Sequence, residues 1–494
     1  MLLDEFAMEP QSNGVKAHDQ HDTGISHDVS STQGSPNALS ARVMEALYSE
    51  SVMAKVWRIA AKAMGNTNPP VLYPEYTGKD GATYVYRSLD FWTSGFFPGS
   101  LYLLLERIIR YPHISLSKSA DDDPPTRPHK LQLEYLCRWW TVNLHQNALK
   151  RDTHDLGFMI APWAMKSWDL HRDPAAYSSL IMAAHSLASR FSSTTQCLRS
   201  WDTCITKRYS FTDPSMDFLF IIDNMLNLDL LFWAAKETEN PELYRIALAH
   251  ARTSRIHHIR EDNSTFHVVN LDPETGDVKA KFTNQGYSDE SCWARGQAWG
   301  ILGFMQTFQW TGKIEFLDTA KALADYFIAH LPADGVPYWD LTAPIIETSP
   351  RDTSAAMIAA CGMLLLYKAL KPSCEADRFL REAMNLVDAT VGKFVDVPTL
   401  HFQSTRPQSQ CDVFRDGCVE YSDDAFDTLT VVDRIDLKLR DTIVHGATIN
   451  NYEFAPRRWA NHGLVYADYY FLLFGNMLLE LGLVGVADCN IGRL

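Results

Sequence analysis

Amphipathic helical stretches follow one another along this chain, and strand-like segments are scarce. In each stretch, apolar residues recur at three- and four-residue steps, the spacing of one face of a helix. The stretches span residues 41–64, 97–110, 130–149, 176–191, 216–237, 241–259, 293–311, 314–330, 353–369, 375–394 and 463–483. With little sheet to cover them, these helices must bury their apolar faces on one another. The pattern predicts an all-α fold of packed helical hairpins, and six hairpins closed into a ring would satisfy it.

Two segments differ from this helical body. Residues 1–38 are rich in Ser, Gly, Asp, Gln and His and poor in apolar residues, so we expect a disordered acidic tail. Residues 39–494 are then expected to form a single catalytic domain. Within that domain, the region of about 396–440 lacks helical periodicity and is predicted to be an irregular insertion.

Charge and composition exclude several classes of protein. The net charge of −15 disfavours nucleic acid binding, which needs a basic face. We expect no membrane segment, because no apolar run reaches about 18 residues, and the first residues do not resemble a secretory signal. The nine cysteines are scattered, which indicates reduced thiols and a cytoplasmic location. The sequence leaves the oligomeric state open.

Asp223 is the sharpest local anomaly in the chain. It directly follows the apolar run 218–222 and precedes Asn224, inside the predicted helix 216–237. Burial among apolar neighbours disfavours the charged form of a carboxyl group, so we expect a raised pKa. A raised pKa suits a general acid that works near neutral pH. The alternative is a capping or hydrogen-bonded core aspartate, and the local pattern leaves both open.

Other polar residues stand in similar surroundings. Asp155 follows His154 in a turn that opens an apolar segment, where simple N-capping is the alternative. Arg295 lies between Trp293 and Trp299, so its guanidinium either stacks structurally or binds a carboxylate. The chain lacks the GxSxG, P-loop and HExxH motifs. We therefore do not expect a zinc site.

Several long segments, taken in order, resemble the unsaturated glucuronyl hydrolases of glycoside hydrolase family 88. They are DFWTSGFFPG, THDLGFM, IIDNMLNLDLLFWA, HVVNLDPETGDV, NQGYSDESCWARGQAWG, VPYWDLTAP, PRDTSAA and LVYADYYF, between about residues 88 and 470. The resemblance implies an (α/α)6 barrel of the six-hairpin type. It also implies hydrolysis of lyase-generated oligosaccharides by hydration of a Δ4,5-unsaturated uronic acid at the non-reducing end, without a cofactor.

The resemblance also implies roles for individual residues. By the IIDN match, Asp223 is expected to donate the proton and activate the water, and by the HDLGF match Asp155 is the second essential carboxylate. The residues expected around the sugar are Trp92, His154, Asn224, His267, Gln285, Arg295, Trp299 and Tyr338, with Trp92 and Tyr338 as aromatic walls. Aromatic side chains suit this role because sugar rings stack on them.

The segment 396–440 and the acidic tail have no counterpart in the resemblance, and the region that would contact the next sugar is the least matched. The substrate preference is therefore open. One alternative activity is that of an unsaturated rhamnogalacturonyl hydrolase, which shares the barrel and the hydration chemistry. Another is a binding or biosynthetic protein that reuses the same cleft. Retention of Asp155 and Asp223 favours the hydrolase.

Overall fold

Helices dominate the computed structural model, which describes residues 40–114, 127–405, 428–433 and 439–484. These residues belong to one compact unit. The helices are α1 Ala41–Tyr48, α2 Glu50–Lys62, α3 Phe96–Arg110, α4 Lys130–Thr141, α5 Leu156–His171, α6 Pro174–Ala188, α7 Leu228–Glu237, α8 Pro241–His258, α9 Ala294–Thr311, α10 Ile314–Ala329, α11 Thr353–Leu370, α12 Cys374–Phe394 and α13 Val465–Glu480. Shorter 3-10 turns are η1 Ala63–Gly65, η2 Pro112–Ile114, η3 Leu144–Leu149 and η4 Ile222–Asn227.

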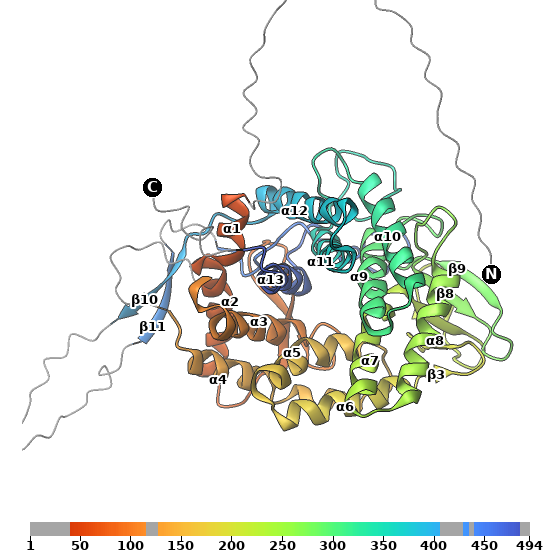
Figure 1. Ribbon diagram of the computed structural model, residues 1–494, viewed down its shortest axis with the longest axis horizontal. Coiled ribbons are helices and arrows are strands. Elements are labelled where there is room, and N and C mark those ends of the chain that lie inside the picture. Colours follow the sequence, from red (N-terminus) through yellow and green to blue (C-terminus); the bar gives the residue numbers. More distant parts are fainter. Residues whose placement is uncertain (1–39, 115–126, 406–427, 434–438, 485–494) are drawn as a thin grey trace, which may run out of the picture. The chain divides into compact units, whose positions relative to one another are not determined.

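Six of these helices form a closed inner ring. Helix α3 contacts α5, and the ring continues through α7, α9 and α11 to α13, which contacts α3 again (Figure 1). Helices α4, α6, α8, α10 and α12 each pack outside the inner helix that precedes them in the chain. Two nested layers of alternating helices make an (α/α)6 barrel, so the predicted fold class is confirmed.

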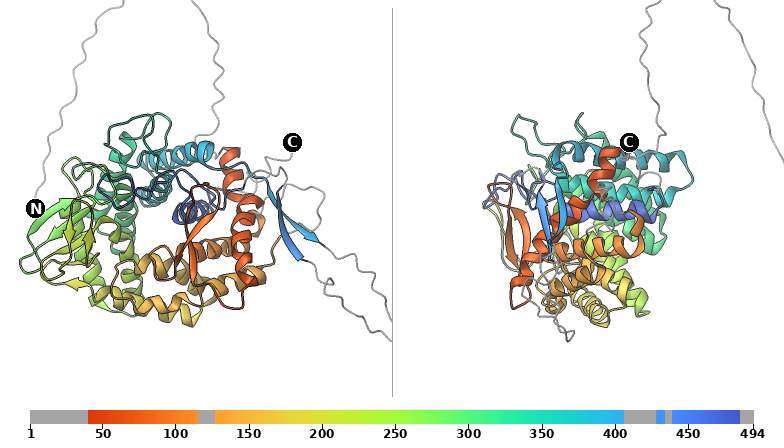
Figure 2. Two further views of the ribbon diagram at one scale, coloured as in Figure 1. Left: turned by 180° about the vertical axis from the view of Figure 1, so that it is seen from behind. Right: turned by 90° about the vertical axis from the view of Figure 1, so that its left-hand side faces the viewer.

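This alternation places the N-terminal ends of the inner helices on the same side of the molecule. Each inner helix from α3 to α11 is followed by an outer helix that runs back, so the inner helices start at one end of the ring. Figure 2 shows the β1–β2 hairpin at one end of the ring as well. The hairpin precedes α3, and the Thr77 amide donates to the Gly463 carbonyl, just before α13, at 2.9 Å. Segments that precede inner helices therefore meet, although they are far apart in sequence.

The strands form small antiparallel sheets beside the barrel. They are β1 Leu72–Thr77, β2 Tyr84–Ser88, β3 Phe191–Ser192, β4 Cys197–Leu198, β5 Cys204–Ile205, β6 Ser210–Phe211, β7 Phe218–Ile221, β8 Val268–Leu271, β9 Val278–Phe282, β10 Leu400–Thr405 and β11 Thr428–Asp433. The largest sheet that the structure describes has the order β7-β8-β9, with Phe218 opposite Leu271 and Ile221 opposite Val268.

The single helix predicted over residues 216–237 is wrong in its first part. Residues Phe218–Ile221 form strand β7, and a helix begins only after them, as η4 and then α7. Both faces of β7 are buried: Phe218 and Phe220 pack in one apolar cluster, and Leu219 and Ile221 pack in another. A continuous apolar run of this length fits a strand buried on both sides as well as a helix, so periodicity alone could not separate them.

The region 396–440 is only partly irregular. Its described ends pair as an antiparallel ladder, β10 with β11, in which Leu400 lies opposite Asp433. Strand β10 contacts α2. The expectation for residues 1–38 and the centre of the insertion, 406–427, lie outside the described residues.

Helix α11 is the most apolar of the inner helices. Among the described residues, it is the one helix long and apolar enough to span a membrane, yet 78% of that stretch is buried within the protein. Its composition is explained by its place in the ring, where α9, α10, α12 and α13 contact it. A helix with neighbours on all sides is apolar all round.

The buried carboxylate of Asp468 connects segments from the beginning and the end of the barrel domain. Asp468 of α13 accepts hydrogen bonds from Tyr84 Oη at 2.7 Å, from Thr442 Oγ1 at 3.0 Å and from the backbone amides of Ile443 and Val444. Burial raises its pKa to about 6, although these donors favour the charged form.

This shift predicts a pH dependence of stability. The folded state holds the Asp468 proton more tightly than the unfolded chain, so its stabilising contribution is complete below pH 4 and is lost as the pH rises to about 6. We expect the Asp468 contribution to the free energy of unfolding to fall by roughly 2–3 kcal/mol over this window. Urea unfolding of the protein and of Asp468→Asn at pH 4–7 checks this prediction. The free energy of unfolding is plotted against pH for both proteins, and the difference between the two curves isolates the Asp468 carboxyl group. Parallel curves would contradict the prediction.

Gly157 brings α5 close to η4, the turn that carries Asp223. A Cβ atom at Gly157 would lie 2.5 Å from Asn227 Oδ1 and 2.7 Å from Asn227 Cα. We expect Gly157→Ala to destabilise the protein by about 1–3 kcal/mol, because neither backbone can move freely in the packed interior. Gly65→Ala is the matched control, since a Cβ there would have no neighbour within 4 Å. Equal thermal stability of the two variants would show that the α5–η4 contact is loose.

Candidate active site

Asp155 and Asp223 each lie at the start of a helical segment beneath one end of the ring. Asp155 occupies the N-cap position of α5, and Asp223 lies in the first turn of η4, directly after β7. The Asp155 side chain makes no capping hydrogen bond. Simple N-capping, the alternative that the sequence left open for Asp155, therefore does not explain its position.

His154 joins the two carboxylates. Its Nε2 atom lies 3.2 Å from Asp155 Oδ1 and 3.2 Å from Asp223 Oδ1. Its Nδ1 atom lies 3.0 Å from the Ser200 carbonyl oxygen, which only accepts hydrogen bonds, so Nδ1 carries a hydrogen. The His154 side chain is 1% exposed, and the two carboxylates are 15% and 17% exposed. The carboxylates thus reach solvent while the imidazole stays behind them.

The surroundings of Asp155 and His154 shift the pKa values of both groups. Burial raises the pKa of Asp155, and the negative charge of Asp223 raises it further, while the His154 charge opposes both effects. Burial favours the neutral form of His154, but Asp155 and Asp223 outweigh it, and the pKa of His154 is raised. The two neighbouring carboxylates thus favour the protonated form of the His154 imidazole.

The two carboxylates differ in their remaining contacts. Asp155 Oδ2 accepts from Thr153 Oγ1 at 2.9 Å, so both of its oxygens are engaged. Asp223 Oδ1 contacts His154, whereas Asp223 Oδ2 has no hydrogen-bond partner among the residues that the structure describes. Asp223 therefore keeps one oxygen available for a substrate, and Asp155 is held in place.

Asn224 lies deeper than its neighbour in the sequence. Its Nδ2 atom donates to Ser200 Oγ at 3.4 Å, and the residue is fully buried. Its Oδ1 atom is buried without a partner in the described part of the chain. The predicted role of Asn224 as a sugar ligand stays a prediction.

Aromatic side chains pack around Phe158, which follows Asp155 by one turn of α5. Trp92 is partly exposed and packs on Phe158, one turn after Asp155, with ring centroids 5.6 Å apart. It also packs on Tyr466 of α13 at 5.1 Å. Trp299 is 1% exposed and lies behind Phe158 at 5.3 Å. Trp92 is thus placed to form a wall, whereas Trp299 supports that wall from the interior.

His267 lies beside η4 and is neutral. Its backbone carbonyl accepts from the Ile222 amide at 3.2 Å, next to Asp223 in the chain. Its Nδ1 atom accepts from the Asn284 amide at 3.1 Å, so Nε2 carries the hydrogen and can donate. Burial, and then the Arg295 charge, lower the pKa of His267 to about 3.

Arg295 is locked within the protein. Its guanidinium donates to Asp352 Oδ2 at 2.6 Å, to the Thr448 and Ile449 carbonyls and to Gln285 Oε1 at 3.2 Å. The side chain is 2% exposed. The guanidinium also lies 4.7 Å from the Trp293 ring centroid, so Arg295 both stacks on an aromatic ring and pairs with a carboxylate of the protein itself. Binding of a sugar carboxylate by Arg295 stays a prediction.

Tyr338 is half-buried, and one face of its ring is occupied. The Arg351 guanidinium lies 3.9 Å from the ring centroid. The next residue, Trp339, accepts a hydrogen bond from the Ala294 amide at 3.0 Å, which ties this segment to the start of α9. Any sugar contact with Tyr338 must use its edge or its other face.

Sequence reasoning missed Ser200 and Arg190. Both lie around the short β3–β4 hairpin and carry no motif. The Ser200 carbonyl oxygen contacts His154, and the Arg190 guanidinium donates to that same oxygen. The described residues also contain no group of three or more His, Cys, Asp or Glu side chains placed to hold a metal ion.

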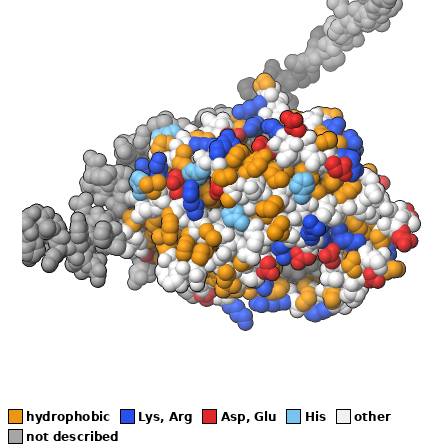
Figure 3. Space-filling model, turned by 90° about the horizontal axis from the view of Figure 1, so that it is seen from below, with side chains coloured by type: hydrophobic (Ala, Val, Ile, Leu, Met, Phe, Trp, Pro, Cys, Tyr) orange, Lys and Arg blue, Asp and Glu red, His pale blue; other side chains and the backbone are white. Residues whose placement is uncertain are grey.

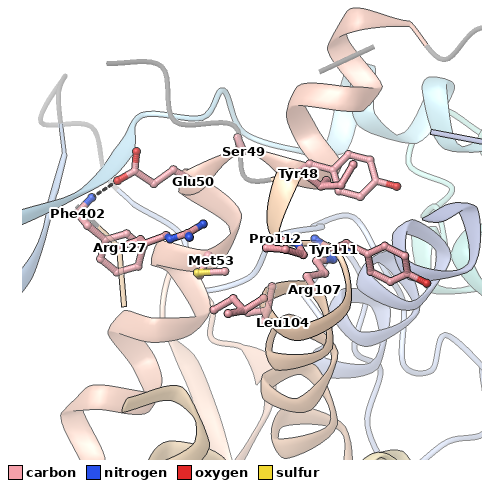
Figure 4. Close-up of a pocket in the computed structure, with 12 residues that line it drawn as sticks. Tyr48, Ser49, Glu50, Met53, Leu104, Arg107, Tyr111, Pro112, Arg127 and Phe402 are labelled. Carbon is pink, nitrogen blue, oxygen red and sulfur yellow. Dashed lines mark hydrogen bonds between the residues drawn. The ribbon is translucent and has the colours of Figure 1, made fainter. Parts of the chain in front are cut away.

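Another pocket does not coincide with the predicted site residues. The pocket in Figure 4 is lined by residues of α1, α2 and α3, including Tyr48, Met53 and Leu104, and contains none of the predicted site residues. On the face shown in Figure 3, Lys and Arg side chains are interspersed with Asp and Glu. That pattern does not suit a polyanion.

Comparison with known proteins gives the family. No family model matches the chain. An unsaturated glucuronyl hydrolase of Formosa agariphila is 37% identical over 281 residues, which cover 56% of this chain and 63% of that protein. An unsaturated glucuronyl hydrolase of Bacillus sp. (strain GL1) is 35% identical over 316 residues, covering 63% of this chain and 76% of the relative.

Solved structures extend the likeness to most of the chain. An unsaturated glucuronyl hydrolase specific for heparin matches with a TM-score of 0.68 and 25% identity, over 90% of this chain and 99% of that chain. A structure named as UGL with dGlcA-Glc-Rha-Glc matches with a TM-score of 0.65 and 25% identity, over 88% and 97%. The barrel, the paired carboxylates and these likenesses agree with the resemblance in the sequence. The chain belongs to the unsaturated glucuronyl hydrolases, which are glycoside hydrolases with an (α/α)6 barrel.

Proposed function

We propose that this protein removes a Δ4,5-unsaturated glucuronic acid from the non-reducing end of lyase-generated oligosaccharides by hydrating the C4=C5 bond. The observation that carries the proposal is the contact of Asp155 and Asp223 with one nitrogen of His154, at 3.2 Å each. This arrangement supplies a proton donor and a second carboxylate at a partly exposed surface beside Trp92.

The substrate explains why a single acid suffices. Its C4=C5 bond is an enol ether conjugated to the ring oxygen, so protonation at C4 places positive charge on C5 and that oxygen. Water then adds at C5 and loses a proton to the same carboxylate. The resulting hemiketal opens and rearranges, which releases the rest of the saccharide. The spacing rule for two carboxylates in ordinary glycosidases does not apply, because the anomeric carbon is not attacked directly.

Each residue of the site has a task in this scheme. Asp223 delivers the proton to C4 through its unpartnered Oδ2 atom and then accepts the proton of the water. Asp155, held by Thr153 and His154, binds substrate hydroxyls and keeps negative charge next to the developing cation. His154 orients both carboxylates through its Nε2 atom. Trp92 forms the wall on which the sugar ring stacks.

The neighbouring sugar is the open part of the specificity. The relatives' names include heparin for one structure and a glucosyl residue for another. Within this family, therefore, the same barrel accepts different sugars next to the unsaturated residue. We propose that this chain's preference is likewise set outside the carboxylate site, by the loops that face the leaving saccharide.

Incubation with unsaturated disaccharides from several polysaccharide lyases tests the proposal. The enol-acid absorbance is lost when C4=C5 is hydrated, so at least one glucuronyl digest should lose absorbance. Unchanged absorbance with every glucuronyl digest would contradict the proposed activity. If only an unsaturated rhamnogalacturonan digest loses absorbance, the protein is an unsaturated rhamnogalacturonyl hydrolase instead.

A further inference from the structure

Ser200 connects residues that otherwise belong to separate parts of the site. Its carbonyl oxygen accepts two hydrogen bonds, from His154 Nδ1 at 3.0 Å and from Arg190 Nη2 at 3.2 Å. The residue is fully buried. The shared acceptor atom holds the imidazole and the guanidinium within about 6 Å of each other, the range over which one charge shifts the pKa of a neighbour.

The Ser200 hydroxyl fixes the other half of the site. It accepts from the Ile221 amide at 3.1 Å and from Asn224 Nδ2 at 3.4 Å. These two residues flank Asp223 at close range along the chain. A displacement of Ser200 would therefore disturb His154 and the Asp223 turn together.

Arg190 makes further hydrogen bonds besides the one to the Ser200 carbonyl oxygen. Its Nη2 atom donates to Asp202 Oδ1 at 2.9 Å, and its Nε atom donates to the Arg199 carbonyl at 2.8 Å. A third bond runs to the Arg151 carbonyl. The Arg190 side chain is 5% exposed, whereas Asp202 is 41% exposed and lines a surface cavity of about 510 Å³. Arg190 thus lies between that cavity and the catalytic imidazole.

We propose that Arg190 is a positioning residue of the hydration reaction, acting on His154 through the Ser200 carbonyl oxygen. Arg190 occupies one lone pair of this oxygen and leaves His154 the other, which fixes the ring orientation and the tautomer. It also places a positive charge behind the imidazole. The proposal rests on the proposed function for its role in turnover, but its effect on His154 exists without a substrate.

The groups that face His154 determine the direction in which its pKa shifts when Arg190 is removed. Asp155 and Asp223 face its Nε2 atom and favour its charged form, while burial and the Arg190 charge oppose it. His250 of α8 is neutral, because burial lowers its pKa to about 3. The Arg190 charge also lowers the pKa of Asp155. Removal of this charge should therefore raise the pKa values of His154 and Asp155 together.

The first test compares Arg190→Gln with Arg190→Lys. For Arg190→Gln, we expect the profile of kcat/KM against pH to move upward by at least about half a pH unit, besides any loss of rate. Arg190→Lys keeps the charge, so its profile should stay in place. Arg42→Gln is the matched control, because Arg42 of α1 is an exposed arginine paired with the exposed Asp388. An unmoved Arg190→Gln profile would overturn the proposal.

Asp202→Asn tests the electrostatic effect of Arg190 with a shift in the opposite direction. It removes the anion that partly neutralises Arg190, so the profile of kcat/KM against pH should move to lower pH. Asp202 is partly exposed, so this variant is expected to fold even where Arg190→Gln does not. A shift to higher pH, or none, would contradict the electrostatic part of the proposal.

Titration of His154 separates this proposal from the proposed function. In protein labelled with ¹⁵N-histidine, the imidazole signal that disappears in His154→Gln belongs to His154. Its pKa should rise in Arg190→Gln and fall in Asp202→Asn without any substrate. If no digest is hydrolysed but these shifts occur, the proposed function fails and the Arg190 coupling stands. If the digests are hydrolysed and the His154 pKa does not change, the coupling fails alone.

Discussion

Replacement of Asp223 with Asn will lower turnover of unsaturated disaccharides by at least about 10²-fold, the lower end expected for loss of a general acid and base. The amide cannot donate an acidic proton to C4 or accept one from water. It keeps the shape of the side chain and can still contact His154, so the fold should be retained. The measurement is the rate of absorbance loss under saturating substrate, with the thermal midpoint followed alongside.

Asp318→Asn is the matched control for this experiment. Asp318 is an exposed residue of α10, remote in the chain from the site segments, so its variant should turn over substrate at the wild-type rate. Wild-type turnover in Asp223→Asn would remove Asp223 from the mechanism. Loss of activity accompanied by a large drop in thermal midpoint would show that Asp223 is structural instead.

The second large effect concerns stability. Arg295→Met should lower the free energy of unfolding by about 3–5 kcal/mol, because it leaves Asp352 as a buried, uncompensated carboxylate. Arg295 and Asp352 are 2% and 0% exposed, and their ion pair measures 2.6 Å. Asp352 also caps α11 by accepting from the Ser354 amide at 3.1 Å. Denaturant unfolding of the variant measures the loss.

A double variant tests the reason for this loss. Arg295→Met with Asp352→Asn removes the stranded charge, so part of the stability should return. Arg245→Met is the surface control, since its ion pair with Glu242 is about half exposed and is expected to contribute less than 1 kcal/mol. If the double variant is less stable than Arg295→Met alone, the stranded charge is not what destabilises the single variant.

The outer helices were predictable because solvent imposes a pattern on them. Helices α8, α10 and α12 each show one apolar face and lie close to the stretches 241–259, 314–330 and 375–394. Inner helix α5 was not predicted, and its sequence LGFMIAPWAMKSWDLH contains Pro162, a residue type that usually interrupts a helix. The stretch 41–64 was predicted as one helix, but Ser49 is extended and divides it into α1 and α2.

The site was predictable only where residues stand in recognisable segments. Asp155 and Asp223 were singled out by their neighbours and by the THDLGFM and IIDN matches, and the structure brings both to His154. Arg295 was singled out by its aromatic flanks, and its engagement with Asp352 could not be read from the sequence, because the two are 57 positions apart. Ser200 acts through a backbone carbonyl, which no side-chain pattern reveals.

The closure of α13 on α3 has a consequence for how the chain matures. The ring closes where its first inner helix, α3, contacts its last, α13. Tyr466 of α13 packs on Trp92, which precedes α3 in the chain. During synthesis the ribosome releases the residues of both carboxylates long before it releases α13. A nascent chain can therefore fold most of its hairpins early, yet its hydrolytic competence should arise only in the last moments of translation.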